Sequence, residues 1–354
     1  MSRRIWSLSV SFLTFCLTVS CGFKAGPQNE ASSIAEPSEI SGTNPAHTQT
    51  LPNISTSPPP TAFNAEFRDV LNEFMGLNER LDRIASRIKI ANADVCATTE
   101  ADIGITTHTL RDYPEELRPA AAHYLNVDNK MSIRTVRAGS AASHARLAAG
   151  DRIIRVNGES LTDGPIFSDP QLAGAVAKAL FHTTLNTIGP DNFAHIDYVR
   201  HNQTYAAQVP ITQQCQLPVT LFFSDNINGH YIDGEIWMTS GLLRDIQDDV
   251  RVAYIMAHEM AHALKEKKTK ARTPEIELEA DRIGLILLAR AGYDPSELAT
   301  FWAEQLNLFD GGEHGSETHP SLQRRADNYA LTLSYIRAAR GDRDKLKALF
   351  VPPE

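Results

Sequence analysis

The chain has 354 residues, of which 42% are apolar and 22% charged, and a formal net charge of −9. This length allows two or three domains with buried cores, and an acidic chain whose one basic run (265–272) is short is not expected to bind nucleic acid. The four cysteines form no C-x-x-C pair, so a cysteine-based zinc site is not expected either.

The first 20 residues have the features of a secretory signal peptide. A charged start precedes an apolar stretch, 5–20, that is too short to span a bilayer comfortably. The stretch ends at Val-Ser-Cys21 and resembles the bacterial lipobox, although Thr18 stands where that pattern prefers Leu, Val or Ile. The resemblance implies a lipid anchor on Cys21, with Gly22 favouring the outer membrane. The expected protein is therefore a periplasm-facing lipoprotein of the bacterial cell envelope, and an ordinary cleaved signal is the alternative.

Two segments of contrasting composition follow. Residues 22–62 are rich in Pro, Ser, Thr, Asn and Gln and nearly free of large apolar side chains, which predicts a disordered tether. Residues 63–95 carry apolar side chains at alternating spacings of three and four from Phe63 to Ile88. This spacing predicts an amphipathic helix that packs on the body of the protein, with a dimer-forming coiled coil as the alternative.

Two cysteines flank the next segment. Cys96 follows the predicted helix, and Cys215 precedes the C-terminal part of the chain. In an oxidising periplasm the two are expected to form a disulfide. The alternative is a pair of free, buried thiols.

Residues 100–212 alternate strand-like stretches with glycine turns. Three pieces, 139–142 (GSAA), 150–154 (GDRII) and 156–158 (VNG), resemble a PDZ domain of the bacterial periplasmic-protease kind, with Arg146 departing from the usual glycine. A helix is expected over 169–180, followed by a closing hairpin around His201-Asn202.

The PDZ resemblance implies a peptide-binding loop and a sheet edge to which a peptide adds as a strand. The stretch in the corresponding place is Tyr124-Leu125-Asn126-Val127. Asn126 replaces a glycine common in that loop, which weakens the case for capture of a peptide carboxylate. The alternative is a scaffold module with a closed groove.

Residues 216–340 carry the chemistry. Residues 218–224 predict a buried strand, and 234–240 predict a second strand, for which we hypothesise an exposed edge where a substrate pairs. The helix predicted over 250–265 contains His258-Glu259-Met260-Ala261-His262. Its two histidines share one helix face and can reach one ion, and the adjacent Glu259 can reach a water on that ion, as in zinc hydrolases.

A third ligand is expected from the helix that Pro274 opens. Glu277 and Asp281 lie four residues apart on one face of it, so one can bind the metal while the other orients a ligand histidine. Glu279 is the competing ligand.

These motifs resemble the zinc metallopeptidases of the HtpX and CAAX-prenyl-endopeptidase type over about 216–330, in a PDZ-containing bacterial lipoprotein branch. The resemblance implies that Glu277 is the ligand and Asp281 its partner. It also assigns places to His319, as an extra ligand or oxyanion donor, and to Arg325, as a partner of Asp281 or a neighbouring carboxylate. The alternatives are a loop histidine and a surface charge.

The expected fold is α+β, with a mainly helical zincin-type domain, a small edge sheet and an inserted PDZ-like β-rich domain. The expected function is a zinc-dependent endopeptidase with one Zn²⁺ per chain, which hydrolyses misfolded or unassembled envelope proteins. A latent-site, chaperone-like or peptide-binding envelope lipoprotein is the alternative, and a non-peptidase zinc hydrolase is a third possibility. The remaining histidines are expected to be structural or exposed, for example at positions 108, 123, 195, 230 and 314.

Overall fold

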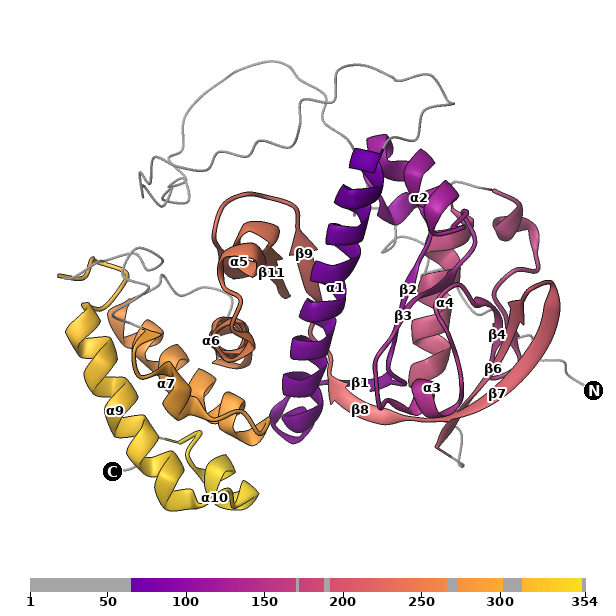
Figure 1. Cartoon of the computed structure of the whole chain (residues 1–354). Coiled ribbons are helices and arrows are strands. Elements are labelled where there is room, and N and C mark those ends of the chain that lie inside the picture. Colours follow the sequence, from indigo (N-terminus) through magenta and orange to yellow (C-terminus); the bar gives the residue numbers. More distant parts are fainter. Residues whose placement is uncertain (1–64, 170–171, 188–191, 266–272, 302–313, 352–354) are drawn as a thin grey trace, which may run out of the picture. The chain divides into compact units, whose positions relative to one another are not determined.

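The structure is a computed structural model that describes residues 65–169, 172–187, 192–265, 273–301 and 314–351. The predicted signal peptide, the lipidation site Cys21 and the tether 22–62 lie outside these ranges. Helices and strands are both abundant, in agreement with an α+β fold (Figure 1). No helix in the described ranges has the length and apolar character needed to cross a bilayer.

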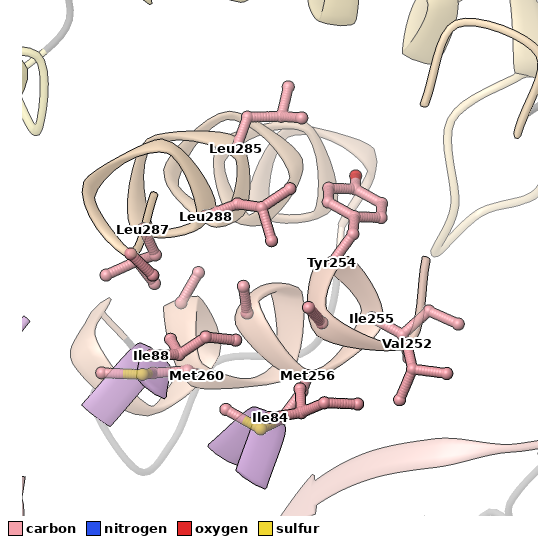
Figure 2. Packing of buried hydrophobic residues seen from close by; sticks show 14 of the residues in the cluster. Ile84, Ile88, Val252, Tyr254, Ile255, Met256, Met260, Leu285, Leu287 and Leu288 are labelled. Atoms are coloured by element: carbon pink, nitrogen blue, oxygen red, sulfur yellow. The ribbon is translucent and has the colours of Figure 1, made fainter. Parts of the chain in front are cut away.

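The predicted amphipathic helix is α1 (Ala65–Ala91). Its C-terminal half inserts Leu81, Ile84 and Ile88 into the main core, where Figure 2 shows the two isoleucines beside Met256 and Met260 of α6 (Asp249–Lys265). Its N-terminal half buries Leu71 in a smaller apolar cluster. The helix therefore packs on the body of the protein, as expected from its spacing.

Residues 105–210 form a six-stranded antiparallel sheet. Its order is β2 (Ile105–His108), β3 (Ser132–Val136), β4 (Arg152–Val156), β6 (Phe193–Arg200) and β7 (Gln203–Pro210), with β5 (Glu159–Ser160) paired to β4. β6 and β7 make the predicted hairpin, and His201 and Asn202 have the positive φ angles that a two-residue turn requires. β2 and β7 are the outer strands of this sheet.

Helices accompany the large sheet: α2 (Arg118–Tyr124), α3 (Ala141–His144) and α4 (Ala173–Asn186). α4 begins and ends later than the predicted 169–180, and a 3-10 turn, η4 (Pro165–Ser168), lies before the predicted start. Gly174 of α4 lies so close to Thr109 and the carbonyl of Asn129 that a Cβ there would clash. The helix thus contacts the segment just beyond β2 directly.

Two short strands connect the large sheet to the rest of the chain. β1 (Thr99–Asp102) pairs with β8 (Thr212–Cys215), so the chain enters and leaves the large sheet side by side. Cys96 and Cys215 are joined by a disulfide next to this pair. The 3-10 turn η1 (Ala93–Val95) precedes Cys96 and contacts β8, whereas η2 (Leu110–Asp112) and η3 (Glu115–Leu117) contact α2.

A three-stranded sheet lies against the helical part, in the order β10 (Gly229–Ile232), β11 (Glu235–Thr239) and β9 (Val219–Phe222). Two expectations are corrected here. β11 is the central strand, so the stretch 234–240 is not a sheet edge, and β10 is the outer strand beside the active-site helix. β9 alternates between half-buried and exposed side chains, so it is not a fully buried strand.

The helical part consists of α5 (Ser240–Asp245), α6 (Asp249–Lys265), α7 (Pro274–Arg290), η5 (Pro295–Leu298), α9 (Leu322–Ala339) and α10 (Arg343–Ala348). α6 packs between α1 and α7, with α9 on the other side of α7 (Figure 1). α7 starts as predicted, because Thr273 caps its first turn and Pro274 occupies the first helical position.

Candidate active site

Helix α6 supplies the centre of the site. His258, Glu259 and His262 are all buried on it, and the two histidines lie one turn apart. Gly284 of α7 allows the two helices to approach closely, since a Cβ there would lie 3.1 Å from the backbone nitrogen of His258. The close approach brings the acidic first turns of α7 within reach of both imidazoles.

Glu277 of α7 meets both histidines. Its carboxylate oxygens lie 3.2 Å from His258 Nε2 and 3.5 Å from His262 Nε2, and the two Nε2 atoms are 3.1 Å apart. Three donor atoms therefore face one point from two helices. Among the described residues this is the one cluster of His, Cys, Asp or Glu with metal-binding spacing.

The donor set fits a zinc ion. Zn²⁺ binds histidine nitrogen and carboxylate oxygen at ~2.0–2.2 Å, and a tetrahedral arrangement then separates neighbouring donors by ~3.3–3.5 Å. The two Nε2 atoms are 3.1 Å apart, and one carboxylate oxygen of Glu277 lies 3.2 Å from His258 while the other lies 3.5 Å from His262, which is close to that value. Two histidines and one glutamate are also a common set for catalytic zinc, which keeps a fourth position for water or substrate.

Asp281 orients the first histidine. Its Oδ1 atom lies 2.9 Å from Nδ1 of His258, which directs the opposite ring nitrogen, Nε2, toward His262 and Glu277. The same oxygen accepts a hydrogen bond of 2.9 Å from the hydroxyl of Tyr254. Figure 2 shows Tyr254 extending from α6 toward α7. Burial and the charge of Asp281 raise the pKa of Tyr254 well above its usual value, so this hydroxyl remains a donor.

Arg325 of α9 neutralises part of the acidic charge. Its side chain is 2% exposed and lies 3.3 Å from Glu277 and 3.5 Å from Asp281, so it is not a surface charge. With neutral imidazoles, the carboxylates of Glu259, Glu277 and Asp281 and this one guanidinium have a formal net charge of −2. A bound Zn²⁺ brings that charge to zero, which is a second reason why the site fits the metal.

The same acidic field acts on His258. Burial alone lowers the pKa of His258, but the hydrogen bonds and charges of Asp281 and Glu277 outweigh it and raise the pKa to about 10. The site therefore attracts positive charge at this nitrogen, and a metal ion competes with a proton for it.

Glu259 points to the small sheet. Its Oε2 atom accepts a hydrogen bond of 2.8 Å from the backbone N–H of Tyr231 in β10. The turn between β10 and β11 is the two-residue pair Asp233–Gly234 with positive φ angles, and the N–H of Ile236 donates to Pro218 on the far side of β11. The opposing pair Tyr231–Ile236 is thus not hydrogen-bonded, and the main-chain groups of Tyr231 point away from β11.

His319 lies beside the three donors rather than among them. Its Nε2 atom is 4.0 Å from a carboxylate oxygen of Glu277, and its Nδ1 atom is 2.8 Å from the hydroxyl of Thr318. The competing ligand Glu279 does not join the cluster, because its carboxylate pairs with Arg282 on the same helix.

The stretch Tyr124–Val127 is placed away from this site. Tyr124 ends α2, and Asn126 has a positive φ angle. Val127 is 3% exposed and packs with Leu71 of α1, and Leu125 packs against the same cluster. Their side chains therefore serve packing, and a peptide-binding role of this stretch stays a prediction. Strand β1, which precedes the outer strand β2, ends in Asp102, and this residue pairs with Arg137.

Two residues that take part in the site were missed in the sequence. Tyr254 precedes His258 by one helical turn, so its position on the metal-binding face was available as a signal. The role of Tyr231 is a backbone contact, which no residue pattern reveals.

Comparisons with known proteins point in the same direction. The model of Peptidase family M48 matches residues 270–330, which include Glu277, Asp281, His319 and Arg325. The mitochondrial metalloendopeptidase OMA1 of Arabidopsis thaliana is 30% identical over 26% of this chain, and the match spans only about a quarter of that relative, 26%.

Two solved structures resemble part of the chain weakly. The HtrA-type protease AlgW with a decapeptide is 14% identical, and the match covers 33% of this chain and 30% of that chain with a TM-score of 0.23. The HtrA3 PDZ domain bound to a phage-derived ligand is 19% identical, and the match covers 33% of this chain and 89% of that chain with a TM-score of 0.21. Likeness at this level carries no argument about the large sheet. Residues 270–330 are thus similar to Peptidase family M48, and this similarity, the relative and the geometry of the site together support a zinc metalloprotease.

Proposed function

We propose that this chain is a zinc-dependent endopeptidase of the HtpX type, anchored in the bacterial cell envelope. The observation that carries the proposal is the convergence of His258, His262 and Glu277 on one point, with Glu259 on the same helix. A structural ion needs no additional carboxylate beside its ligands, whereas a hydrolase needs a base at that place.

Each residue of the site has a distinct role in the proposed reaction. His258, His262 and Glu277 would hold a zinc ion, which would supply Lewis-acid chemistry that polarises a carbonyl and makes water more acidic. Glu259 takes the proton of the attacking water and returns it to the leaving amine. Asp281 fixes the ring of His258, and Arg325 holds Glu277 and Asp281 in place.

A substrate chain is expected to bind along β10. The main-chain groups of Tyr231 face away from β11, and the N–H of this residue already reaches Glu259. A peptide that pairs with this edge as an additional strand therefore lies beside the base, which favours an extended, locally unfolded polypeptide as the substrate.

The cellular setting is part of the proposal. The lipobox-like residues before Cys21 and the polar stretch 22–62 support a lipid anchor with a tether. The disulfide between Cys96 and Cys215 suits an oxidising compartment such as the periplasm. The large sheet would then act as a PDZ-like module that engages or regulates misfolded or unassembled envelope proteins.

The test combines metal content with casein hydrolysis in the full-length chain, its Glu259→Gln variant and the exposed control Glu275→Gln. We expect about one zinc per chain in all three and hydrolysis lost only in Glu259→Gln. Absence of zinc would overturn the ligand assignment, and undiminished hydrolysis in Glu259→Gln would overturn the role of the base.

His319 separates the endopeptidase from the latent-site alternative. If the wild type binds zinc and is inert, while His319→Ala hydrolyses casein, then the site is latent and held closed by His319. If both bind zinc and neither hydrolyses peptides, the chain is a binding protein rather than an enzyme.

A further inference from the structure

The outer face of the small sheet carries a patch of apolar side chains. Phe222 of β9, Ile232 of β10 and Trp237 of β11 are 47%, 52% and 38% exposed. The rings of Phe222 and Trp237 are in contact, with centroids 5.3 Å apart. We call these three residues the outer patch.

The alternation of the strands explains why these side chains share one face. Ile236 and Met238 of β11 are buried in the main core, as expected for the face toward α6. Trp237 lies between them in sequence and so points the other way. Single exposed apolar residues are common, whereas two exposed aromatic rings in contact on one sheet face favour a binding surface.

The outer patch is continuous with the proposed substrate edge. Ile232 belongs to β10, and Trp237 lies opposite His230 in the neighbouring strand. A chain that pairs with the outer edge of β10 alternates in the same way, so every second side chain falls on the outer face. Those side chains lie next to His230 and Ile232, and a long one extends across β10 toward Trp237.

We propose that the outer patch selects substrates with aromatic or aliphatic side chains at alternate positions of the bound strand. The inference rests on the proposed endopeptidase function and adds a substrate class to it. Segments of this kind are buried in folded proteins and become accessible in unfolded ones. The patch would therefore discriminate between the two.

The charges around the patch favour a polypeptide over other occupants. Asp233 lies in the adjoining turn, and Glu235 lies on the same strand as Trp237, bonded to Thr220. These carboxylates disfavour an anionic lipid surface, which attracts basic rather than acidic residues. They also disfavour Asp and Glu in the substrate at the positions that fall on this face.

The experiment compares cleavage profiles on a peptide library. The double variant Phe222→Ser/Trp237→Ser removes the aromatic part of the patch, and Tyr205→Ser is the matched control, because Tyr205 is an aromatic residue 41% exposed on β7 of the other sheet. None of these residues belongs to the proposed catalytic machinery.

The wild type and Tyr205→Ser are expected to prefer aromatic and aliphatic residues at every second position on one side of the cleaved bond, and to avoid Asp and Glu there. In the double variant, the ratio of the cleavage rates of the preferred and the poorest peptides should fall about tenfold, while the rate on the poorest peptides stays the same. An unchanged profile in the double variant would overturn the inference and leave the endopeptidase standing.

A measurement without turnover completes the test. In the inactive Glu259→Gln background, two peptides that differ only by Phe or Ser at alternate positions should bind with dissociation constants about tenfold apart, and the double substitution should remove that difference. Equal binding of both peptides overturns the inference. A loss of self-association or of binding to phosphatidylglycerol vesicles in the double variant, with peptide binding intact, also overturns it in favour of another occupant.

Discussion

The backbone N–H of Tyr231 donates to the carboxylate of Glu259 at 2.8 Å, which ties the outer strand of the small sheet to the proposed base. The two residues belong to separate elements, β10 and α6, whose contact is formed only in the folded protein. One oxygen of Glu259 is held by this bond, so the direction of the carboxylate is set by the strand that is expected to bind the substrate. Substrate position and base position are therefore coupled through one peptide group.

Removing this single N–H should impair turnover. In Tyr231→Pro the missing N–H is one that faces away from β11, so the hairpin keeps its hydrogen bonds. The control Tyr231→Ala loses the same side chain and keeps the N–H. Because hydrogen bonds to charged groups contribute about 1.5–3 kcal/mol, kcat/KM of Tyr231→Pro should be about 10- to 100-fold below that of Tyr231→Ala. Equal values for the two variants, at equal zinc content, would refute the coupling.

The hydroxyl of Tyr254 should strengthen metal binding through Asp281. Tyr254→Phe removes only the donor to Asp281, and loss of such an indirect contact typically weakens metal affinity 10- to 100-fold. Tyr329→Phe is the matched control, because it removes a buried hydroxyl that donates to Pro295 instead. Zinc affinity measured by competition with a chelator should fall in Tyr254→Phe alone. Equal affinities in both variants would show that the hydroxyl has no influence on the metal.

The sequence was sufficient for parts of the site that are local to one helix. The spacing of His258 and His262 fixes a shared face, and Thr273 with Pro274 marks the start of α7. It was insufficient where contacts are made through space. The strand 234–240 has the composition of a sheet strand, but only the pairing of β9 and β10 on its two sides makes it central. Tyr231 acts through its backbone, and a side-chain pattern carries no information about that.

In the metal-free protein, Arg325 should stabilise the fold by balancing the charges of Glu277 and Asp281. Arg325→Met leaves Glu277 and Asp281 buried without their cation, which typically costs 3–5 kcal/mol. The neighbouring Arg324→Met is the control, because Arg324 pairs at the surface with Glu275, a kind of pair that contributes about 0–1 kcal/mol. Urea unfolding in EDTA should show the large loss only for Arg325→Met, and zinc should recover part of it. Similar losses for the two variants would contradict the role of Arg325.

The disulfide should be a large contribution to stability. Cys96 and Cys215 are 119 residues apart, and the chain-entropy model gives about 4–5 kcal/mol for a loop of that length. Reduction should therefore lower the midpoint of urea unfolding of the wild type. Cys96→Ala/Cys215→Ala should start at the lower midpoint and be insensitive to the reductant. A wild type that is equally stable with and without reductant would show that the bond is absent or contributes nothing.

His108 should make the protein sensitive to acid. Its ring is 3% exposed and bonded to the hydroxyl of Tyr113, and burial, with help from the charge of Arg134, lowers its pKa from 6.5 to about 4. Above pH 6.5 the ring is neutral in both the folded and the unfolded state. Between pH 6.5 and 4 this histidine is protonated in the unfolded chain but stays neutral in the folded chain. The free energy of unfolding therefore falls as the pH decreases, by up to about 3 kcal/mol near pH 4.

His108→Asn keeps a polar group near Tyr113 but does not titrate, and the exposed His195→Asn is the control. The free energy of unfolding is measured with urea between pH 7.5 and 4.5 in EDTA. As the pH falls, it should decrease more for the wild type than for His108→Asn, whereas His195→Asn should follow the wild type. A pH-independent difference for His108→Asn would show that this histidine is not the acid-sensitive group.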